Sequence, residues 1–228
     1  MYSLHFPRRL PVQDRQFLKK DVFGEVWLLL GDHGQTILRD ARPARWWCAW
    51  LARRLLQREA RALAALQGID GVPELISSDD TTLNRSFLQG SPIFDGRPKE
   101  HQFYNDAMRL LRRIHSAGVV HNDLAKEPNI LLLKDGSAGF IDFQLASYTN
   151  KRGRLFRAIA REDIRHLLKH KRTYRPDLLT ARERSILETP SPLSRAWMTF
   201  VKPVYLFVTR RLMGWSDREG AADRGRQD

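Results

Sequence analysis

Cysteine is almost absent from this sequence, in which Cys48 is the only one among 228 residues. A single cysteine rules out an intramolecular disulfide, and the sequence holds no CxxC pair or Cys/His cluster of the kind that binds structural zinc. Chains without disulfides are typical of reducing compartments. We therefore expect a cytoplasmic protein with a hydrophobic core, for which 42% hydrophobic residues over this length suffice.

Long hydrophobic runs are also missing. Residues 1–15 contain no apolar stretch of signal-peptide length. The most apolar late segment, residues 197–208, reads WMTFVKPVYLFV and is interrupted by Lys202 and Pro203. It is too short to cross a bilayer. Packing in the core and contact with a membrane surface both stay open for it, so the inner face of the membrane stays open as a location.

Acidic residues are outnumbered, since 26 Asp and Glu face 39 Lys and Arg and give a net charge of +13. The excess is concentrated in residues 151–184, which hold 12 basic and 4 acidic residues, a local charge of +8. A field of this size attracts phosphates, nucleic acid or anionic lipid. Solvated helix faces are the plainer interpretation of the same residues.

The pattern of the first ninety residues predicts a small sheet and one long helix. Residues 17–40 are rich in strand-forming side chains broken by turn signals, which predicts antiparallel strands. Residues 43–68 predict a helix whose apolar stripe includes Trp47, Trp50 and Leu55. For the tryptophans at 46, 47 and 50 we favour core packing over a membrane belt. Glu59 lies near the apolar stripe, so its carboxylate needs a cation partner.

The rest of the chain predicts a mainly helical region around one hairpin, which makes the fold class α+β. A hairpin is expected over residues 129–143, with Asp135 and Gly136 at its turn. Residues from 214 on have the composition of a disordered tail. The other expected elements are strands at 71–77 and 81–90, a linker at 90–98, and helices at 103–117, 155–170 and 181–187.

Three polar side chains flank that hairpin. The stretch 119–133, VVHNDLAKEPNILLL, contains Asp123 and Asn129, and Asp142 follows near the end of the second strand. Since the hairpin brings its two ends together, Asn129 and Asp142 are placed to share a hard cation such as Mg²⁺. Asp123 is placed to accept a proton or orient a hydroxyl. This layout suits phosphoryl transfer.

The motif HNDLAKEPNILL followed by FIDFQLA resembles the catalytic loop and metal-binding segment of the protein-kinase-like superfamily. It is most similar to bacterial RIO-like and lipopolysaccharide-core (Kdo/heptose) kinases, and the resemblance covers residues 17–168. It implies a two-lobed protein-kinase-like fold. Residues 1–90 would form an N-terminal lobe with a small antiparallel sheet and one long helix. Residues 91–213 would form a mainly helical catalytic lobe with the hairpin, before a disordered tail at 214–228.

The resemblance also implies roles for individual residues. Asp123 resembles the catalytic base, and Lys126 the residue that contacts the transferred phosphate. Asn129 and Asp142 resemble the Mg²⁺ ligands. Glu59 resembles the helix glutamate that pairs with a strand cation, and Arg39 stands where that cation is expected. Gly24 resembles the turn that covers the phosphates. Phe87 and Leu88 would form the adenine hinge, and Asp163 resembles the buried side chain that braces the catalytic loop. His121 is expected to support the loop by hydrogen bonding.

Several positions depart from the family pattern. Asn129 follows Asp123 by six residues where five are usual, so a bulge is expected before it, at Pro128. Arg39 stands where the family has lysine, and the exchange is not conservative at a phosphate site. The glycine-rich loop is reduced to Gly24, and DFG becomes DFQ. Residues 145–155 leave no room for a long activation segment, which argues against a conventional protein kinase.

The sequence therefore predicts an ATP- and Mg²⁺-dependent kinase that phosphorylates a hydroxyl of a protein or an anionic glycan, docked on residues 151–184. Serine/threonine and lipopolysaccharide kinase activities both stay open. One alternative is a catalytically weak pseudokinase scaffold, which Arg39 and the altered loop favour. Another is a basic protein that binds nucleic acid or makes peripheral contact with an anionic membrane.

Overall fold

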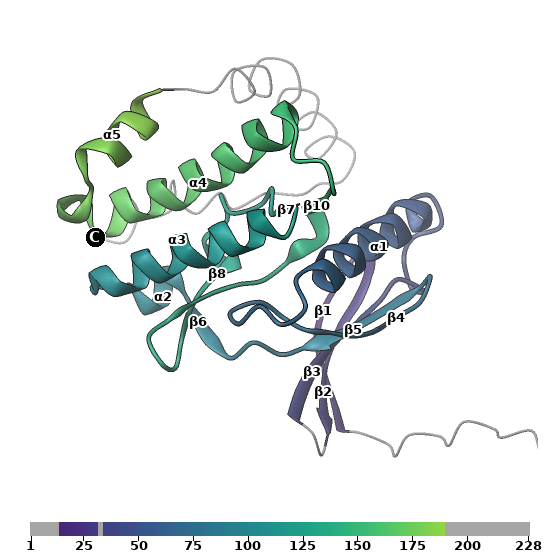
Figure 1. The fold of residues 1–228 in the computed structure, drawn as a ribbon. Helices are drawn as coiled ribbons and strands as arrows, with labels where there is room; N and C mark the ends of the chain where they lie inside the picture. Colours follow the sequence, from purple (N-terminus) through teal and green to yellow (C-terminus); the bar gives the residue numbers. More distant parts are fainter. Residues whose placement is uncertain (1–13, 32–33, 190–228) are drawn as a thin grey trace, which may run out of the picture.

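The computed structural model describes residues 14–31 and 34–189, and they form a mixed α+β structure (Figure 1). A five-stranded antiparallel sheet has the order β1-β2-β3-β5-β4. Its strands are β1 (Asp14–Asp21), β2 (Gly24–Gly31), β3 (Gly34–Asp40), β4 (Leu75–Ser78) and β5 (Thr82–Ser86). The strands expected over residues 17–40, 71–77 and 81–90 are therefore confirmed, within a few residues at their ends.

The long helix expected next is α1 (Ala49–Ala65), which packs against this sheet. Its inward side chains Ala52 and Leu56 share a small core with Ala41 and Leu83 of the sheet region. Further along α1, Leu63 enters the main core of the molecule. The buried positions recur every three or four residues, as a helix with one buried face requires.

The core packing predicted for three tryptophans is wrong. Trp46, Trp47 and Trp50 are 89%, 43% and 67% exposed. Trp46 and Trp47 precede the first residue of α1, so no helical stripe includes them. Trp50 lies two residues before the buried Ala52, which turns it about 200° away around the helix axis. The stripe is set by smaller side chains, and the indoles lie outside it.

The predicted linker at residues 90–98 is also wrong in its first half. Residues Gly90–Pro92 form β6, which pairs antiparallel with the first strand of the hairpin, and Ile93–Gly96 form the short helix α2. Ile93 is fully buried in the main core. The residues of β6 itself, Gly, Ser and Pro, are typical of turns. They form a strand because they pair with a distant segment, from Leu131 to Leu133.

The expected hairpin is present as β8 (Ile130–Leu133) and β9 (Ala138–Phe140), which complete a sheet of order β6-β8-β9. Gly136 in its turn has φ +82°, a conformation that glycine adopts without strain. The turn predicted at Asp135 and Gly136 is thus confirmed. The two ends of this hairpin carry the polar side chains considered below.

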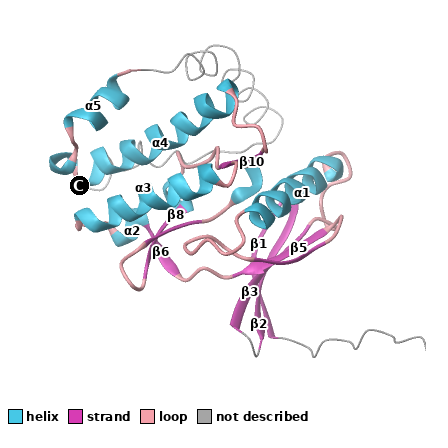
Figure 2. Ribbon diagram, viewed as in Figure 1, coloured by secondary structure: helices cyan, strands magenta, loops and turns pink. Residues whose placement is uncertain are grey.

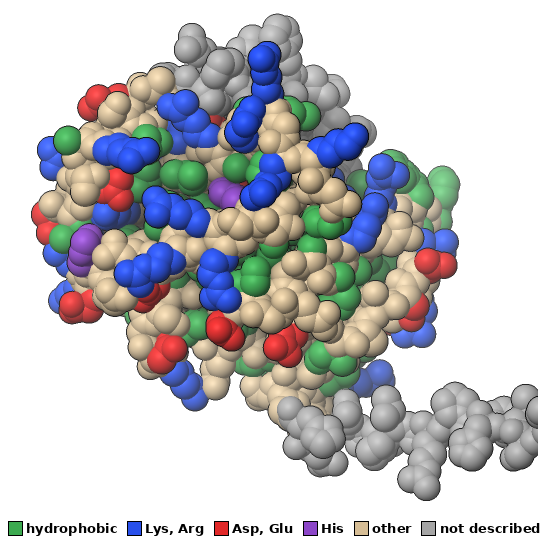
Figure 3. Space-filling view, in the orientation of Figure 1, with side chains coloured by type: hydrophobic (Ala, Val, Ile, Leu, Met, Phe, Trp, Pro, Cys, Tyr) green, Lys and Arg blue, Asp and Glu red, His purple; other side chains and the backbone are tan. Residues whose placement is uncertain are grey.

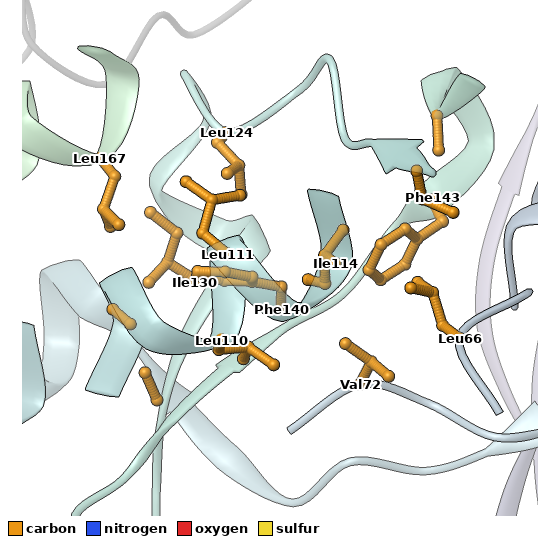
Figure 4. Packing of buried hydrophobic residues seen from close by; sticks show 14 of the residues in the cluster. Leu66, Val72, Leu110, Leu111, Ile114, Leu124, Ile130, Phe140, Phe143 and Leu167 are labelled. Atoms are coloured by element: carbon orange, nitrogen blue, oxygen red, sulfur yellow. The ribbon is translucent and has the colours of Figure 1, made fainter. Parts of the chain in front are cut away.

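Three helices are stacked beside this second sheet, the first on β9, the second on the first and the third on the second (Figure 2). They are α3 (His101–Ser116), α4 (Arg154–Tyr174) and α5 (Ala181–Glu188), in agreement with the three predicted helices. Figure 4 shows Leu111 and Ile114 of α3 packed with Ile130 and Phe140 of the hairpin. Leu167 brings α4 into the same core. This core fixes the segments before and after the hairpin relative to each other.

Within residues 14–31 and 34–189, no helix combines the length and the apolar character needed to cross a bilayer. The apolar segment 197–208 and the tail predicted at 214–228 lie outside the described residues. The chain leaves the five-stranded sheet after Ser86 and enters the second sheet at Gly90.

Candidate active site

The polar loop at residues 121–129 is anchored by a buried carboxylate on α4. Asp163 is 1% exposed, as the prediction of an inward side chain required. Its two oxygens accept the backbone N–H groups of His121 at 2.7 Å and Asn122 at 2.9 Å, and Nε2 of His115 lies 3.2 Å from one of them. Bonds to a charged acceptor are strong. They hold Asn122 in a left-handed conformation, with φ 65°.

His121 fixes the same loop from inside. Its side chain is fully buried, with Nε2 3.0 Å from the Ile141 carbonyl oxygen and Nδ1 accepting the Asp123 N–H at 3.3 Å. These partners suit a neutral imidazole that donates from Nε2. Burial lowers the pKa of His121, which favours the same neutral form. The supporting role predicted for His121 agrees with these bonds.

The Asp123 carboxylate is held by two residues of its own loop. Nδ2 of Asn129 donates to its Oδ2 at 3.0 Å and to its backbone oxygen at 2.9 Å, and Nζ of Lys126 lies 3.1 Å from Oδ2. Burial raises the pKa of Asp123 although Lys126 and Asn129 oppose the rise. The charge of Asp142 adds to the rise in the pKa of Asp123.

Before Asn129 the loop forms a 3₁₀ turn, Glu127–Asn129, with Pro128 near its start. This turn occupies the place of the expected bulge and leaves Asn129 in contact with Asp123. A second anchor, which the sequence did not reveal, holds the loop just before it. Nε2 of His170 on α4 lies 2.8 Å from the Leu124 carbonyl oxygen.

Asp142 ends the hairpin in a left-handed conformation, with φ 66°. Its Oδ1 lies 3.7 Å from Nη1 of Arg39 and accepts a hydrogen bond from Nε2 of Gln144 at 2.8 Å. Burial alone would raise the pKa of Asp142, but the charge of Arg39 and the bond from Gln144 outweigh it and lower the pKa. Asp142 is therefore the more acidic of these two carboxylates, and Asp123 the more basic one.

Arg39 connects this carboxylate to a buried glutamate. Its Nη1 is 3.3 Å from Oε2 of Glu59, which is fully buried on α1, so the predicted pairing of Arg39 with Glu59 is confirmed. A second cation, Arg85, approaches the other oxygen of Glu59, with Nε 3.2 Å from Oε1. The Arg85 N–H does not point at that oxygen, so the contact is ionic and not a hydrogen bond.

Arg85 was missed, although the sequence carries a signal for it. In β5 the buried positions alternate, so Arg85 lies on the same inward face as Leu83. Because an inward cation needs an anion, Glu59 on the neighbouring helix was the available partner. Burial lowers the pKa of Arg85, which Glu59 opposes.

Gly24 lies at a close approach between two strands. Its φ is +134°, and a Cβ atom there would lie 2.1 Å from the Asp40 carbonyl oxygen. Only glycine fits this position. A small pocket, partly open to solvent, is lined by Gly24, Arg39, Leu55 and Gln144 among others. Its cavity volume is about 10 Å³, room for about one water molecule.

The predicted hinge residues lie where the chain crosses between the two sheets. The Phe87 N–H donates to the Gln35 carbonyl oxygen at 3.0 Å, which extends the pairing of β3 and β5 by one residue. A methyl group of Leu88 lies 2.7 Å from where a Cβ of Gly139 would be. Neither residue lines the pocket under Gly24.

Arg58 of α1, which the sequence analysis did not single out, ties this helix to the segment after Asp142. Its guanidinium donates to the carbonyl oxygens of Leu145 at 2.8 Å and Ala146 at 3.2 Å. That segment then pairs as β10 (Ser147–Tyr148) with β7 (Val119–Val120), directly before the polar loop. No sequence pattern marks Arg58, because its partners are backbone groups far along the chain.

The side chains of the polar loop and of Asp142 determine which metal ion could bind there. In the described part of the chain, no three His, Cys, Asp or Glu side chains converge on one metal position. Mg²⁺ needs fewer protein ligands, because it keeps water and substrate phosphates as the others. Since Nδ2 of Asn129 is engaged with Asp123, its amide oxygen is the atom left to bind a cation. With the ionised Asp142 carboxylate, this donor set fits Mg²⁺.

The basic region 151–184 divides into structural and exposed residues. Arg165 donates to the Thr189 and Leu187 carbonyl oxygens, Lys171 pairs with Glu183, and Arg175 pairs with Asp177. The exposed basic residues of α4 share one helical face, namely Arg154, Arg157, Arg161, Lys169 and Arg172. Figure 3 shows Lys and Arg side chains gathered over the region of α3 and α4.

No protein-family model matches the chain, and a search of curated proteins finds no match either. A function must therefore be argued from the site itself.

Proposed function

We propose that this protein is an ATP- and Mg²⁺-dependent phosphotransferase with a two-lobed, protein-kinase-like fold. The order of elements supports the fold: a five-stranded sheet with α1, a crossing segment at residues 87–89, and a helical part that presents a polar loop and a hairpin. One observation carries the function. Asp123 and Asn129 are hydrogen-bonded in that loop, and Arg39 links Asp142, which follows the hairpin, to the buried Glu59 of α1.

In this proposal Asp123 orients the acceptor hydroxyl and accepts its proton. Its raised pKa makes it a stronger base than an exposed aspartate, and its bonds to Asn129 and Lys126 fix its direction. Arg39 and Lys126 supply positive charge for the phosphates, and Glu59 keeps Arg39 in place. Mg²⁺ held by Asn129 and Asp142 would neutralise further phosphate charge when bound.

The direct test is phosphate transfer by the purified full-length chain. The protein is incubated with γ-labelled ATP and Mg²⁺, with deacylated lipopolysaccharide core in one reaction and a generic protein in another. Label in either acceptor supports the proposal and identifies the acceptor class. The Asp123→Asn variant serves as the negative control. Absence of label in both acceptors, of autophosphorylation and of ATP hydrolysis would contradict it.

The exposed basic face of α4 supports an anionic acceptor. We expect the double substitution Arg157→Glu, Arg161→Glu to raise KM for the acceptor about tenfold and leave kcat unchanged, because these side chains would attract the acceptor without contacting the reacting atoms. The matched control is Arg182→Glu, Arg184→Glu, which reverses two exposed charges on α5. Equal effects of both variants would show that net charge matters and the α4 face does not.

A catalytically weak scaffold is the second candidate, because Asp142 already has two partners. Oδ1 accepts the Gln144 amide, and Arg39 lies nearby. A cation that binds Asp142 must compete with both of them. This competition is the feature that favours weak catalysis or none.

Replacing Gln144 by Ala tests this competition. A hydrogen bond to a charged group is worth about 1.5–3 kcal/mol, so its removal should lower the Mg²⁺ concentration for half-maximal activity about tenfold. The measurement is a Mg²⁺ titration of phosphate transfer at saturating ATP. An unchanged midpoint would mean that Gln144 does not compete with the metal.

A further inference from the structure

Three indole side chains form an exposed cluster at the start of α1. This tryptophan patch consists of Trp46, Trp47 and Trp50, and two of its members are more than half exposed. Trp46 and Trp47 lie in the turn that leads into α1, and Trp50 is the second residue of the helix, so the three indoles are close along the chain. Single exposed apolar residues are ordinary, but a cluster of large ones marks an interaction surface.

Arginines flank this patch along the sequence. Arg45 precedes the first indole, and Arg53 and Arg54 follow Trp50 by three and four residues, which places them beside it on the helix surface. The sequence from residue 41 to residue 58 contains no Asp or Glu. Across residues 14–31 and 34–189, none of the observed ion pairs involves these three arginines.

The segment that carries Trp46 and Trp47 is tied to the turn between β1 and β2. The Arg45 N–H donates to the Val22 carbonyl oxygen at 3.1 Å, and the buried Cys48 thiol donates to the same oxygen at 3.0 Å. Arg42 is fixed by Asp40, with Nη2 2.6 Å from Oδ2. A surface that is already ordered loses little conformational entropy when it binds.

We propose that the tryptophan patch and its three arginines dock the protein on a membrane surface that carries anionic lipids. Indole rings prefer the boundary between headgroups and acyl chains, because one part is apolar and the N–H remains hydrated. The arginines match the negative headgroups, and the net charge of +13 adds attraction. This docking extends beyond the proposed phosphotransfer and does not depend on it.

Two other occupants fit the patch less well. A second copy of the chain would bring Arg45, Arg53 and Arg54 against their own copies, which repel. Single-stranded nucleic acid stacks on aromatic rings along a groove that follows its backbone. The pocket found beside α1 includes none of the three indoles among its lining residues.

The test is sedimentation of the full chain with vesicles of phosphatidylcholine alone or mixed with phosphatidylglycerol. We expect binding to the mixed vesicles only, and quenching of tryptophan fluorescence by lipids brominated on their acyl chains. The triple variant Trp46→Ala, Trp47→Ala, Trp50→Ala should bind at least tenfold more weakly. Neutralising the three arginines to Gln should weaken binding about fivefold for each charge.

The control variant is Ile76→Ala, which removes an exposed apolar side chain of β4 outside the patch and should bind like the wild type. Thermal unfolding of each variant checks its fold, and the quenching measurement on the wild type needs no variant. The proposal fails if wild-type binding shows no quenching, if the triple tryptophan variant binds undiminished, or if single-stranded RNA protects the indoles and anionic vesicles do not.

Discussion

Replacing Asp123 by Asn should lower the rate of phosphate transfer about 100-fold to 10,000-fold, the usual contribution of a general base. The substitution keeps the size of the side chain and its position between Asn129 and Lys126, and removes its ability to accept a proton. The loss should appear in kcat and leave KM for ATP near its wild-type value. Steady-state kinetics with labelled ATP measure both quantities.

Stability provides the control for this substitution. Burial raises the pKa of Asp123, so the folded protein binds this proton more tightly than the unfolded chain does. The ionised carboxylate therefore lowers stability at neutral pH, and its contribution becomes more favourable as pH falls through the folded-state pKa. Asp123→Asn should then unfold at the same temperature as the wild type or higher. A large loss of stability would indicate a structural role instead.

The same pKa shift predicts how activity depends on pH. Because a protonated carboxyl cannot accept the hydroxyl proton, the wild-type rate should fall as pH decreases through the raised pKa of Asp123. This acid limb should lie above pH 3.8, the ordinary value of an aspartate, and should be absent from the residual activity of Asp123→Asn. A profile that is identical in the two proteins would assign the limb to another group.

Replacing Glu59 by Ala should lower the free energy of unfolding by about 3–5 kcal/mol, because it leaves the enclosed guanidinium of Arg85 without its anion and that of Arg39 with Asp142 alone. Glu59 is fully buried, and the side chains of its partners Arg39 and Arg85 are only 13% and 11% exposed. Equilibrium unfolding in urea, extrapolated to water, measures the loss. Activity should fall as well, since Arg39 also contacts Asp142.

Further variants show whether the loss of stability in Glu59→Ala comes from its buried ion pairs. Glu25→Ala removes a glutamate from an exposed pair with Lys20, and should cost about 0–1 kcal/mol. The double variant Glu59→Leu, Arg85→Met removes a charge of each sign. Its loss of unfolding free energy should be smaller than the sum of the losses in Glu59→Leu and Arg85→Met alone. Additive losses would mean that Glu59 and Arg85 do not interact energetically, despite the 3.2 Å contact.

The fold was predictable where each segment carries its own pattern. The helix α3 has apolar residues at 107, 110, 111 and 114, all of them buried, and Gly118 after its end has a positive φ. The hairpin carries a turn signal between two apolar runs. Asp123 and Asn129 therefore lie between the helix and the hairpin, two elements that carry their own patterns, which is why their proximity could be expected.

The parts of the fold that the sequence did not predict depend on pairing between distant segments, or on which residues of a helix face the core. No local pattern marks β6, which exists through its partner β8, or Arg58, whose partners are backbone carbonyls. The tryptophans were expected in the core because the apolar stripe of α1 was assigned from its largest side chains. The stripe follows Ala52, Leu56 and Glu59, and the last of these is a charged residue.

The carbonyl oxygen of Val22 accepts two hydrogen bonds from the segment that carries the tryptophan patch, one from Arg45 and one from Cys48. Val22 is also two residues before Gly24, in the turn between β1 and β2 that borders the pocket. The segment that carries the indoles and the turn beside Gly24 are thus joined by hydrogen bonds at a single oxygen atom, so a displacement of one is coupled to a displacement of the other.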